Sequence, residues 1–188
     1  MDNFITIVSG LPRSGTSMMM QILESGGMEV ITDNIRKANE DNPLGYYEYE
    51  RVKKIKDDTG WLKETRGKAF KMISLLLYDL PSNENYKVIF MKRKMNEILA
   101  SQSKMLERMG NNKDGTSDAK MTEFFNKHLS KIIDWIEGKE YIDVLYIDYS
   151  NLLTNPDEHI KTLNRFLDYK LNEEKAVKVI DKSLYRNR

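Results

Sequence analysis

The sequence contains no cysteine and only two histidines, His128 and His159. Without cysteine the chain has no disulfide bond, no thiolate nucleophile and no cysteine-ligated metal site. The two histidines lie in different predicted helices, which argues against a metal site built on histidine. We therefore expect no metal, and a chemistry carried by other side chains.

The chain also lacks an excess of charge of one sign and any long apolar segment. Its 188 residues include 30 Lys and Arg and 29 Asp and Glu, for a net charge of +1. A balance of this kind argues against nucleic-acid or membrane binding, so any anion site must be local. No apolar run approaches the ~20 residues that span a bilayer, and the first eight residues lack the pattern of a signal peptide. We expect a cytoplasmic protein with a single domain over residues 1–188.

The most informative segment is FITIVSGLPRSGTSMMMQI, residues 4–22. Its β-branched run Phe4–Val8 predicts a buried parallel strand, and Thr16–Ser25 predicts a helix. Between them lies a tight turn, Gly10–Gly15. A strand, a glycine-bounded turn and a helix form a phosphate cradle, because the turn N–H groups and the helix N-terminus carry partial positive charge.

One position of this turn departs from the pattern of nucleotide triphosphatases. Gly10 and Gly15 match the two glycines of G-x-x-x-x-G-K-[ST], but Thr16 stands in place of the lysine. The only cation of the turn is Arg13. The usual cradle for ATP or GTP with magnesium is therefore incomplete. The alternative interpretation is a plain Gly-Pro turn between a strand and a helix.

Strand and helix patterns alternate along the rest of the chain. Further strands are predicted at Met28–Ile31, Ala69–Ser74, Tyr86–Met91 and Ile142–Ile147, and helices at Tyr47–Asp58, Lys94–Met109, Met121–Ile136, Pro156–Leu167 and Asn172–Lys182. Loops are expected over Thr32–Tyr46 and Gly110–Asp118, and a short turn over Asp148–Asn155. The alternation predicts a three-layer α/β/α fold with a central parallel sheet. We place the first strand in the middle, with the phosphate turn at its carboxyl end.

The segment GLPRSGTS, residues 10–17, resembles the 5′-phosphosulfate loop of the sulfotransferases. That family uses 3′-phosphoadenosine 5′-phosphosulfate (PAPS) as sulfuryl donor and has a P-loop-like fold. Its loop carries Lys or Arg before Ser-Gly-Thr, where this chain has Arg13. The resemblance implies that the cofactor is bound by Gly10, Pro12, Arg13, Ser14, Gly15, Thr16 and Ser17, with the last two holding the 5′-phosphate. The family's adenine-stacking Trp is replaced by Met18, which offers a softer surface.

A second segment, residues 86–102, resembles the 3′-phosphate motif of the same family. There an Arg at a strand end and a Ser eight residues later bind the 3′-phosphate, and here they are Arg93 and Ser101. Arg suits this role through its planar fork of donors. The family's proline two residues after the Arg is Met95 in this chain. A basic helix start exposed to solvent is the alternative.

Two further matches lie toward the C-terminus. Tyr149 falls where the family places a tyrosine against the adenine, although the usual Tyr-Glu-Asp reads Tyr-Ser-Asn here. A core tyrosine beside a turn is the alternative. The tail resembles the ends of small bacterial members, so Arg186 or Arg188 is a candidate for the 3′-phosphate, with a frayed basic tail as the other interpretation.

The catalytic base is the least complete part of the resemblance. Lys71 matches the lysine of the Lys-Thr-His segment, but Ile73 stands in place of the histidine. Some branches of the family use a glutamate after the phosphate loop, and Glu48 follows a Pro-x-Gly-Tyr segment of that kind. Glu48 is our first candidate for the base and Glu50 the second. A helix-start glutamate favoured by the dipole is the alternative.

The resemblance implies a PAPS-dependent sulfotransferase of the small bacterial type. It would move a sulfuryl group to a hydroxyl or amine acceptor, release adenosine 3′,5′-bisphosphate (PAP), and need no metal. Arg13, Lys71 and the loop amides would stabilise the charge on the transferring group. The alternatives are a phosphotransferase with a degenerate phosphate loop, and a non-catalytic module that binds PAP or PAPS.

Overall fold

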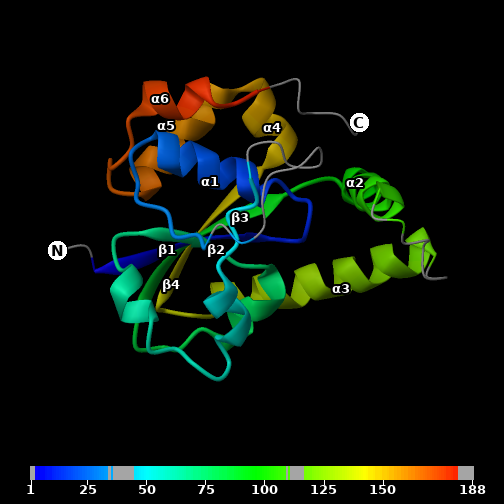
Figure 1. Cartoon of the computed structure of the whole chain (residues 1–188), viewed down its shortest axis with the longest axis horizontal. Coiled ribbons are helices and arrows are strands. Elements are labelled where there is room, and N and C mark those ends of the chain that lie inside the picture. Colours follow the sequence, from blue (N-terminus) through cyan, green and yellow to red (C-terminus); the bar gives the residue numbers. More distant parts are fainter. Residues whose placement is uncertain (1–2, 34, 36–44, 109, 111–116, 182–188) are drawn as a thin grey trace.

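A parallel four-stranded sheet forms the centre of the computed structural model, which describes residues 3–33, 35, 45–108, 110 and 117–181 (Figure 1). The strands follow the order β2-β1-β3-β4. Their bounds are β1 (Phe4–Gly10), β2 (Ala69–Lys71), β3 (Asn85–Lys92) and β4 (Ile142–Asp148). The first strand is one of the two inner strands, as predicted. All carboxyl ends therefore meet at one edge of the sheet, where open α/β folds bind ligands.

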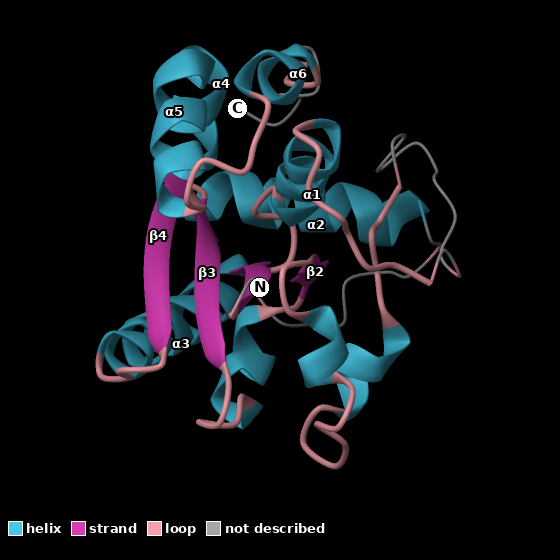
Figure 2. Ribbon diagram, turned by 90° about the vertical axis from the view of Figure 1, so that its left-hand side faces the viewer, coloured by secondary structure: helices cyan, strands magenta, loops and turns pink. Residues whose placement is uncertain are grey.

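Helices cover both faces of the sheet (Figures 1 and 2). One face carries α1 (Thr16–Ser25), α4 (Tyr149–Thr154), α5 (Pro156–Phe166) and α6 (Glu173–Lys178). The other carries α3 (Asp118–Glu137) and the short 3-10 helices η1 (Glu50–Lys54), η2 (Leu62–Thr65) and η3 (Ser74–Asp79). After β3 the chain enters α2 (Met95–Arg108). The predicted three-layer α/β/α fold is confirmed.

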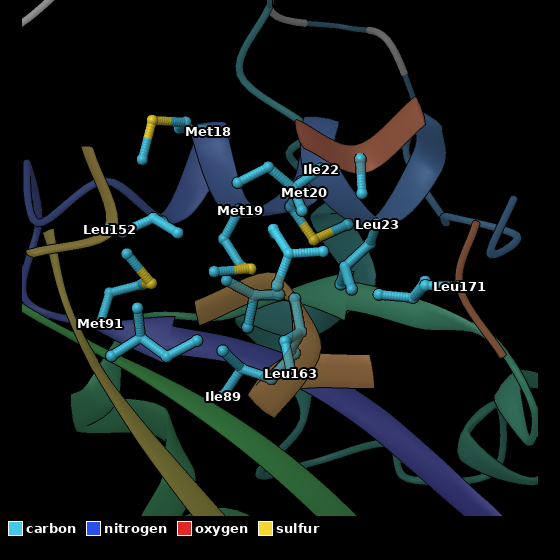
Figure 3. Packing of buried hydrophobic residues seen from close by; sticks show 14 of the residues in the cluster. Met18, Met19, Met20, Ile22, Leu23, Ile89, Met91, Leu152, Leu163 and Leu171 are labelled. Atoms are coloured by element: carbon cyan, nitrogen blue, oxygen red, sulfur yellow. The ribbon is translucent and has the colours of Figure 1, made fainter. Parts of the chain in front are cut away.

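Alternation along the strands builds two cores, one under each helical layer. In β3, Ile89 and Met91 join the cluster beneath α1, whereas Val88 and Phe90 join the cluster over α3. Figure 3 shows the first cluster, in which Met19 and neighbouring α1 side chains pack against strand residues and against α5. Full burial of such a side chain stabilises the fold by about 1.5–3 kcal/mol.

Several predicted boundaries were wrong. The turn expected over Asp148–Asn155 is helix α4, whose first turn is capped because the Asp148 carboxylate accepts a hydrogen bond from Asn151 N at 2.9 Å. The helix expected over Tyr47–Asp58 reduces to η1, and of the strand expected over Met28–Ile31 only Val30 pairs, with Ala69.

The second strand ends at Lys71, because the chain turns into η3 at Ser74. The last helix ends at Lys178. Most of the loops expected over Thr32–Tyr46 and Gly110–Asp118 lie outside the described residues. None of the helices in the described part of the chain has the length and apolarity needed to cross a membrane.

Candidate functional site

The turn after β1 has a backbone that only small residues allow at two positions. Gly10 has φ 148° and Gly15 has φ 100°. A Cβ atom on Gly10 would lie 2.6 Å from Ser14 Oγ and 2.7 Å from the carbonyl oxygen of Met91, closer than real Cβ atoms come. Arg13 takes a left-handed conformation with φ 69°. The turn is therefore compact and sterically defined.

Polar groups inside this turn fit a bound anion. Ser14 is 1% exposed, and its Oγ has no hydrogen-bond partner among the described residues. Helix α1 begins at Thr16 without a side-chain cap, so its first N–H groups have no side-chain acceptor. A phosphate oxygen at this helix start would meet these donors and the positive end of the helix dipole. The residues present thus fit the 5′-phosphate that the sequence predicts.

The two predicted phosphate motifs meet in space. Arg13 donates a hydrogen bond from Nε to Ser101 Oγ at 2.9 Å, across 88 positions of sequence. Arg93 donates from Nη1 to the carbonyl oxygen of Arg13 at 3.0 Å. The strand register explains this meeting, because Gly10 pairs with Met91 and the basic segment follows directly. The two predicted motifs are therefore in direct contact.

Arg93 is held on three sides. Its Nε donates to Glu97 at 2.9 Å, its Nη1 reaches the loop carbonyl, and its guanidinium lies 4.3 Å from the centre of the Tyr149 ring. Sequence reasoning missed Glu97, although its i,i+4 spacing from Arg93 on a helix start was a readable signal. The carboxylate fixes where this cation points.

The Tyr149 ring lies directly against Gly15 of the loop. The ring is 5% exposed, and a Cβ on Gly15 would lie 2.4 Å from its Cδ2 atom. Burial raises the pKa of the Tyr149 hydroxyl above its usual value, so the ring stays neutral. The ring thus lies against Gly15 and Arg93 within the apolar cluster beneath α1, and the predicted adenine contact stays a prediction.

Lys71 reaches the start of α1 from the end of β2. Its Nζ hydrogen-bonds the carbonyl oxygen of Tyr46 and lies 3.4 Å from Ser17 Oγ. Ser17 Oγ itself donates to the Tyr46 carbonyl at 3.3 Å. This arrangement brings a positive charge and the segment around Tyr46 to the predicted 5′-phosphate position.

The two candidate glutamates differ in burial and in their contacts. Glu48 is partly buried, and its carbonyl accepts hydrogen bonds from Thr32 Oγ1 and Asp33 N, both at 3.1 Å. The hydroxyl of the neighbouring Tyr47 donates a hydrogen bond to Glu24 of α1. The Glu50 carboxylate pairs with Lys53 at 2.5 Å on the surface. The catalytic role of Glu48 stays a prediction.

All four strands contribute to this one edge. The phosphate loop follows β1, and Lys71 is the last residue of β2. Arg93 and Tyr149 are the first residues after β3 and β4. The structure thus brings together Gly10, Pro12, Arg13, Ser14, Gly15, Thr16, Ser17, Lys71, Arg93, Ser101 and Tyr149. Arg186 and Arg188 lie outside the described residues.

Comparison with known proteins agrees with this geometry. A family model described as a sulfotransferase domain matches residues 5–188. A sulfotransferase domain from the curacin biosynthetic pathway has the same fold, with a TM-score of 0.57 at 14% identity over 96% of this chain and 79% of its own. The mouse sulfotransferase SULT7A1 complexed with PAP gives a TM-score of 0.51 at 18% identity over 96% of this chain, which spans 63% of that enzyme's length. No curated protein sequence matches the chain significantly.

Proposed function

The chain belongs to the sulfotransferase domain family, and we propose that it moves a sulfuryl group from PAPS to a hydroxyl or amine of a small-molecule acceptor. The observation that carries the proposal is the contact between Arg13 and Ser101, which joins the loop for a 5′-phosphate to the motif for a 3′-phosphate. A nucleotide with phosphates at both positions fits such a site. The solved mouse relative is a complex with PAP.

Each half of the site has its own task. Thr16, Ser17 and the loop amides hold the 5′-phosphate end at the helix start. Arg93 and Ser101 hold the 3′-phosphate, with Arg186 or Arg188 as further candidates. PAPS, when bound, supplies the sulfuryl group and a phosphate leaving group.

The charge that develops at the transfer is met by cations already in place. Lys71 lies within reach of Ser17, and Arg13 is held at Ser101, so both charges are oriented before the reaction. Preorganised charges of this kind lower the barrier because they need no rearrangement. We expect no metal requirement, because these cations take over the neutralising role. Glu48, two residues after Tyr46, is the base that the sequence predicts.

Ligand choice tests the proposal directly. PAP should bind more tightly than 5′-AMP by about 1.5–3 kcal/mol, the usual size of charge-assisted hydrogen bonds to an added phosphate. Isothermal titration calorimetry measures both affinities, and Arg93→Ala should remove most of the difference. Equal affinity of the wild-type protein for the two nucleotides would overturn the assignment.

Two other functions give different outcomes. A phosphotransferase with a degenerate loop would hydrolyse ATP, or transfer a phosphoryl group from it, in the presence of magnesium. A non-catalytic module would bind PAP and PAPS without turnover on any acceptor, a reading supported by Ile73, an exposed residue at the position of the family's histidine.

A further inference from the structure

A hydroxyl and an imidazole from distant parts of the chain meet beside the phosphate loop. Ser74 Oγ and His128 Nε2 lie 2.8 Å apart across 54 positions of sequence. Ser74 begins η3 and is 1% exposed, whereas His128 lies on α3 and is only partly buried. Neither residue belongs to the phosphate machinery described above.

Two sets of contacts place this pair at the carboxyl edge of the sheet. Ser9, the residue before the phosphate turn, donates from Oγ to the carbonyl of Met72 at 2.9 Å, and Ser74 follows two residues later. On the side of α3, Phe125 packs in one cluster with Leu11 of the turn. His128 lies one helical turn from Phe125. The pair therefore flanks the phosphate loop on the α3 face.

The contact with Ser74 prepares His128 to accept a proton. In the tautomer that carries hydrogen on Nε2, Ser74 Oγ accepts this hydrogen and Nδ1 keeps its lone pair. His128 has no second hydrogen-bond partner in the described part of the chain, which leaves Nδ1 open. Burial lowers the pKa of His128, so the neutral ring predominates near pH 7.

Apolar residues next to the pair along the chain are exposed. Ile73 and Leu75, which flank Ser74, are 44% and 56% exposed. Phe124, one turn before His128, is 63% exposed, and the Tyr78 ring meets the imidazole edge-on at 6.3 Å. Exposed apolar residues on the same two segments as a polar pair suit a ligand with an apolar body and a single polar end.

We propose that His128 is the base of the acceptor site, that Ser74 positions it, and that the acceptor is a phenol or alcohol with an apolar body. This inference rests on the proposed sulfuryl transfer. The acceptor O–H gives its proton to His128 Nδ1, and its oxygen forms a bond to sulfur. The bond from sulfur to the 5′-phosphate oxygen breaks, and that oxygen keeps the electron pair. The assignment gives His128 the role that the sequence predicted for Glu48.

Protection from chemical modification tests the acceptor contact without requiring turnover. Because the chain has two histidines, diethyl pyrocarbonate followed by peptide mass spectrometry reports on His128, with His159 of α5 as an internal control. We expect 2-naphthol, added to the PAP-saturated protein, to slow modification of His128 at least about tenfold and to leave His159 unchanged. An unchanged rate at His128 would overturn the proposal.

Rates with 2-naphthol and PAPS then separate the roles of the residues. His128→Ala should lower kcat by about 10²–10⁴-fold with the Kd for PAP unchanged, and added imidazole should restore part of the rate. Ser74→Ala should lower kcat less, also with unchanged Kd. The controls are His159→Ala, which should keep the wild-type rate, and Glu48→Gln. Loss of rate in Glu48→Gln but not in His128→Ala would refute the assignment.

The same measurements distinguish failure of this inference from failure of the proposed function. If the wild-type protein does not bind PAP, the sulfotransferase proposal itself fails. If it binds PAP while 2-naphthol leaves His128 unprotected, only the acceptor assignment is wrong.

Discussion

Glu97 holds Arg93 in a buried ion pair beside the turn that follows β1. Their nearest atoms, a carboxylate oxygen and Nε, are 2.9 Å apart, and the side chains are 2% and 8% exposed. The pair places a negative charge where a phosphate is expected to bind. The ion pair orients Arg93: because the carboxylate binds Nε, the Nη1 atom stays available to donate to the carbonyl oxygen of Arg13 in the loop.

Removing this negative charge should weaken the binding of an anion. We expect Glu97→Ala to lower the free energy of unfolding by about 3–5 kcal/mol, because it leaves the Arg93 charge buried without its carboxylate. PAP affinity should fall as well, since Arg93 loses its orientation. Urea unfolding and calorimetry measure the two effects.

A double replacement provides the matched control for this pair. Arg93→Met combined with Glu97→Leu removes both charges, so its stability should exceed that of Glu97→Ala. Its PAP affinity should remain low. Tighter PAP binding by Glu97→Ala than by the wild-type protein would show that the carboxylate opposes the ligand.

Arg13 should matter for binding and little for folding. Its Nε donates to Ser101 Oγ, and we propose that its charge meets the 5′-phosphate. We expect Arg13→Ala to keep the unfolding midpoint within a few degrees and to weaken PAP binding by about tenfold or more. Thermal unfolding with and without PAP measures both quantities. A variant with wild-type affinity and rate would show that the phosphate loop has been assigned wrongly.

Gly15 should tolerate no side chain, for a reason beyond its backbone angle. Gly15 and Gly27 have nearly equal φ values, 100° and 99°, but only a Cβ on Gly15 would collide with the Tyr149 ring. Gly27→Ala therefore carries the backbone cost alone, about 1–2 kcal/mol. We expect Gly15→Ala to destabilise the protein clearly more than Gly27→Ala in urea unfolding. Equal losses would mean that the ring moves away without cost.

Alkaline pH should lower the free energy of unfolding because of Tyr47, whose hydroxyl donates a hydrogen bond to Glu24 of α1. Burial, first, and the neighbouring carboxylate, second, raise the pKa of the Tyr47 hydroxyl well above its usual value near 10. In the unfolded chain this hydroxyl ionises near pH 10, whereas in the folded protein it stays protonated. Stability should therefore fall as the pH rises above about 10. Tyr47→Phe should make this fall less steep in urea titrations at pH 8–11.

Most of the correct predictions came from the spacing of residues close together in the sequence. The strand-turn-helix around Gly10 and Gly15 and the eight-residue interval from Arg93 to Ser101 are read along the chain, and the structure joins them at one edge. The fold followed for the same reason, since alternating strands and helices have few parallel arrangements. The first strand was also placed in the middle of the sheet, and the order β2-β1-β3-β4 agrees with that prediction.

What escaped prediction depends on contacts between distant segments. The residues near Ser74 in the sequence do not indicate a contact with His128. That contact depends on the chain turning into η3 after the three-residue strand β2 and on the packing of α3. Tyr149 was predicted to be a site residue, but its position against Gly15 needs the placement of β4. The six-residue helix α4 was too short to show a periodic pattern.

The contact between Gly15 and Tyr149 has a consequence for the order in which the protein matures. The loop motif precedes β4 by more than a hundred residues, yet its supporting ring arrives only with the residue after β4. Pairing of such remote segments is slow because a long chain must close before the contact is gained. A nascent chain that ends before β4 carries the whole phosphate motif and still lacks the surface that shapes it. Under the proposed function, nucleotide capture would therefore report on completed assembly of the sheet.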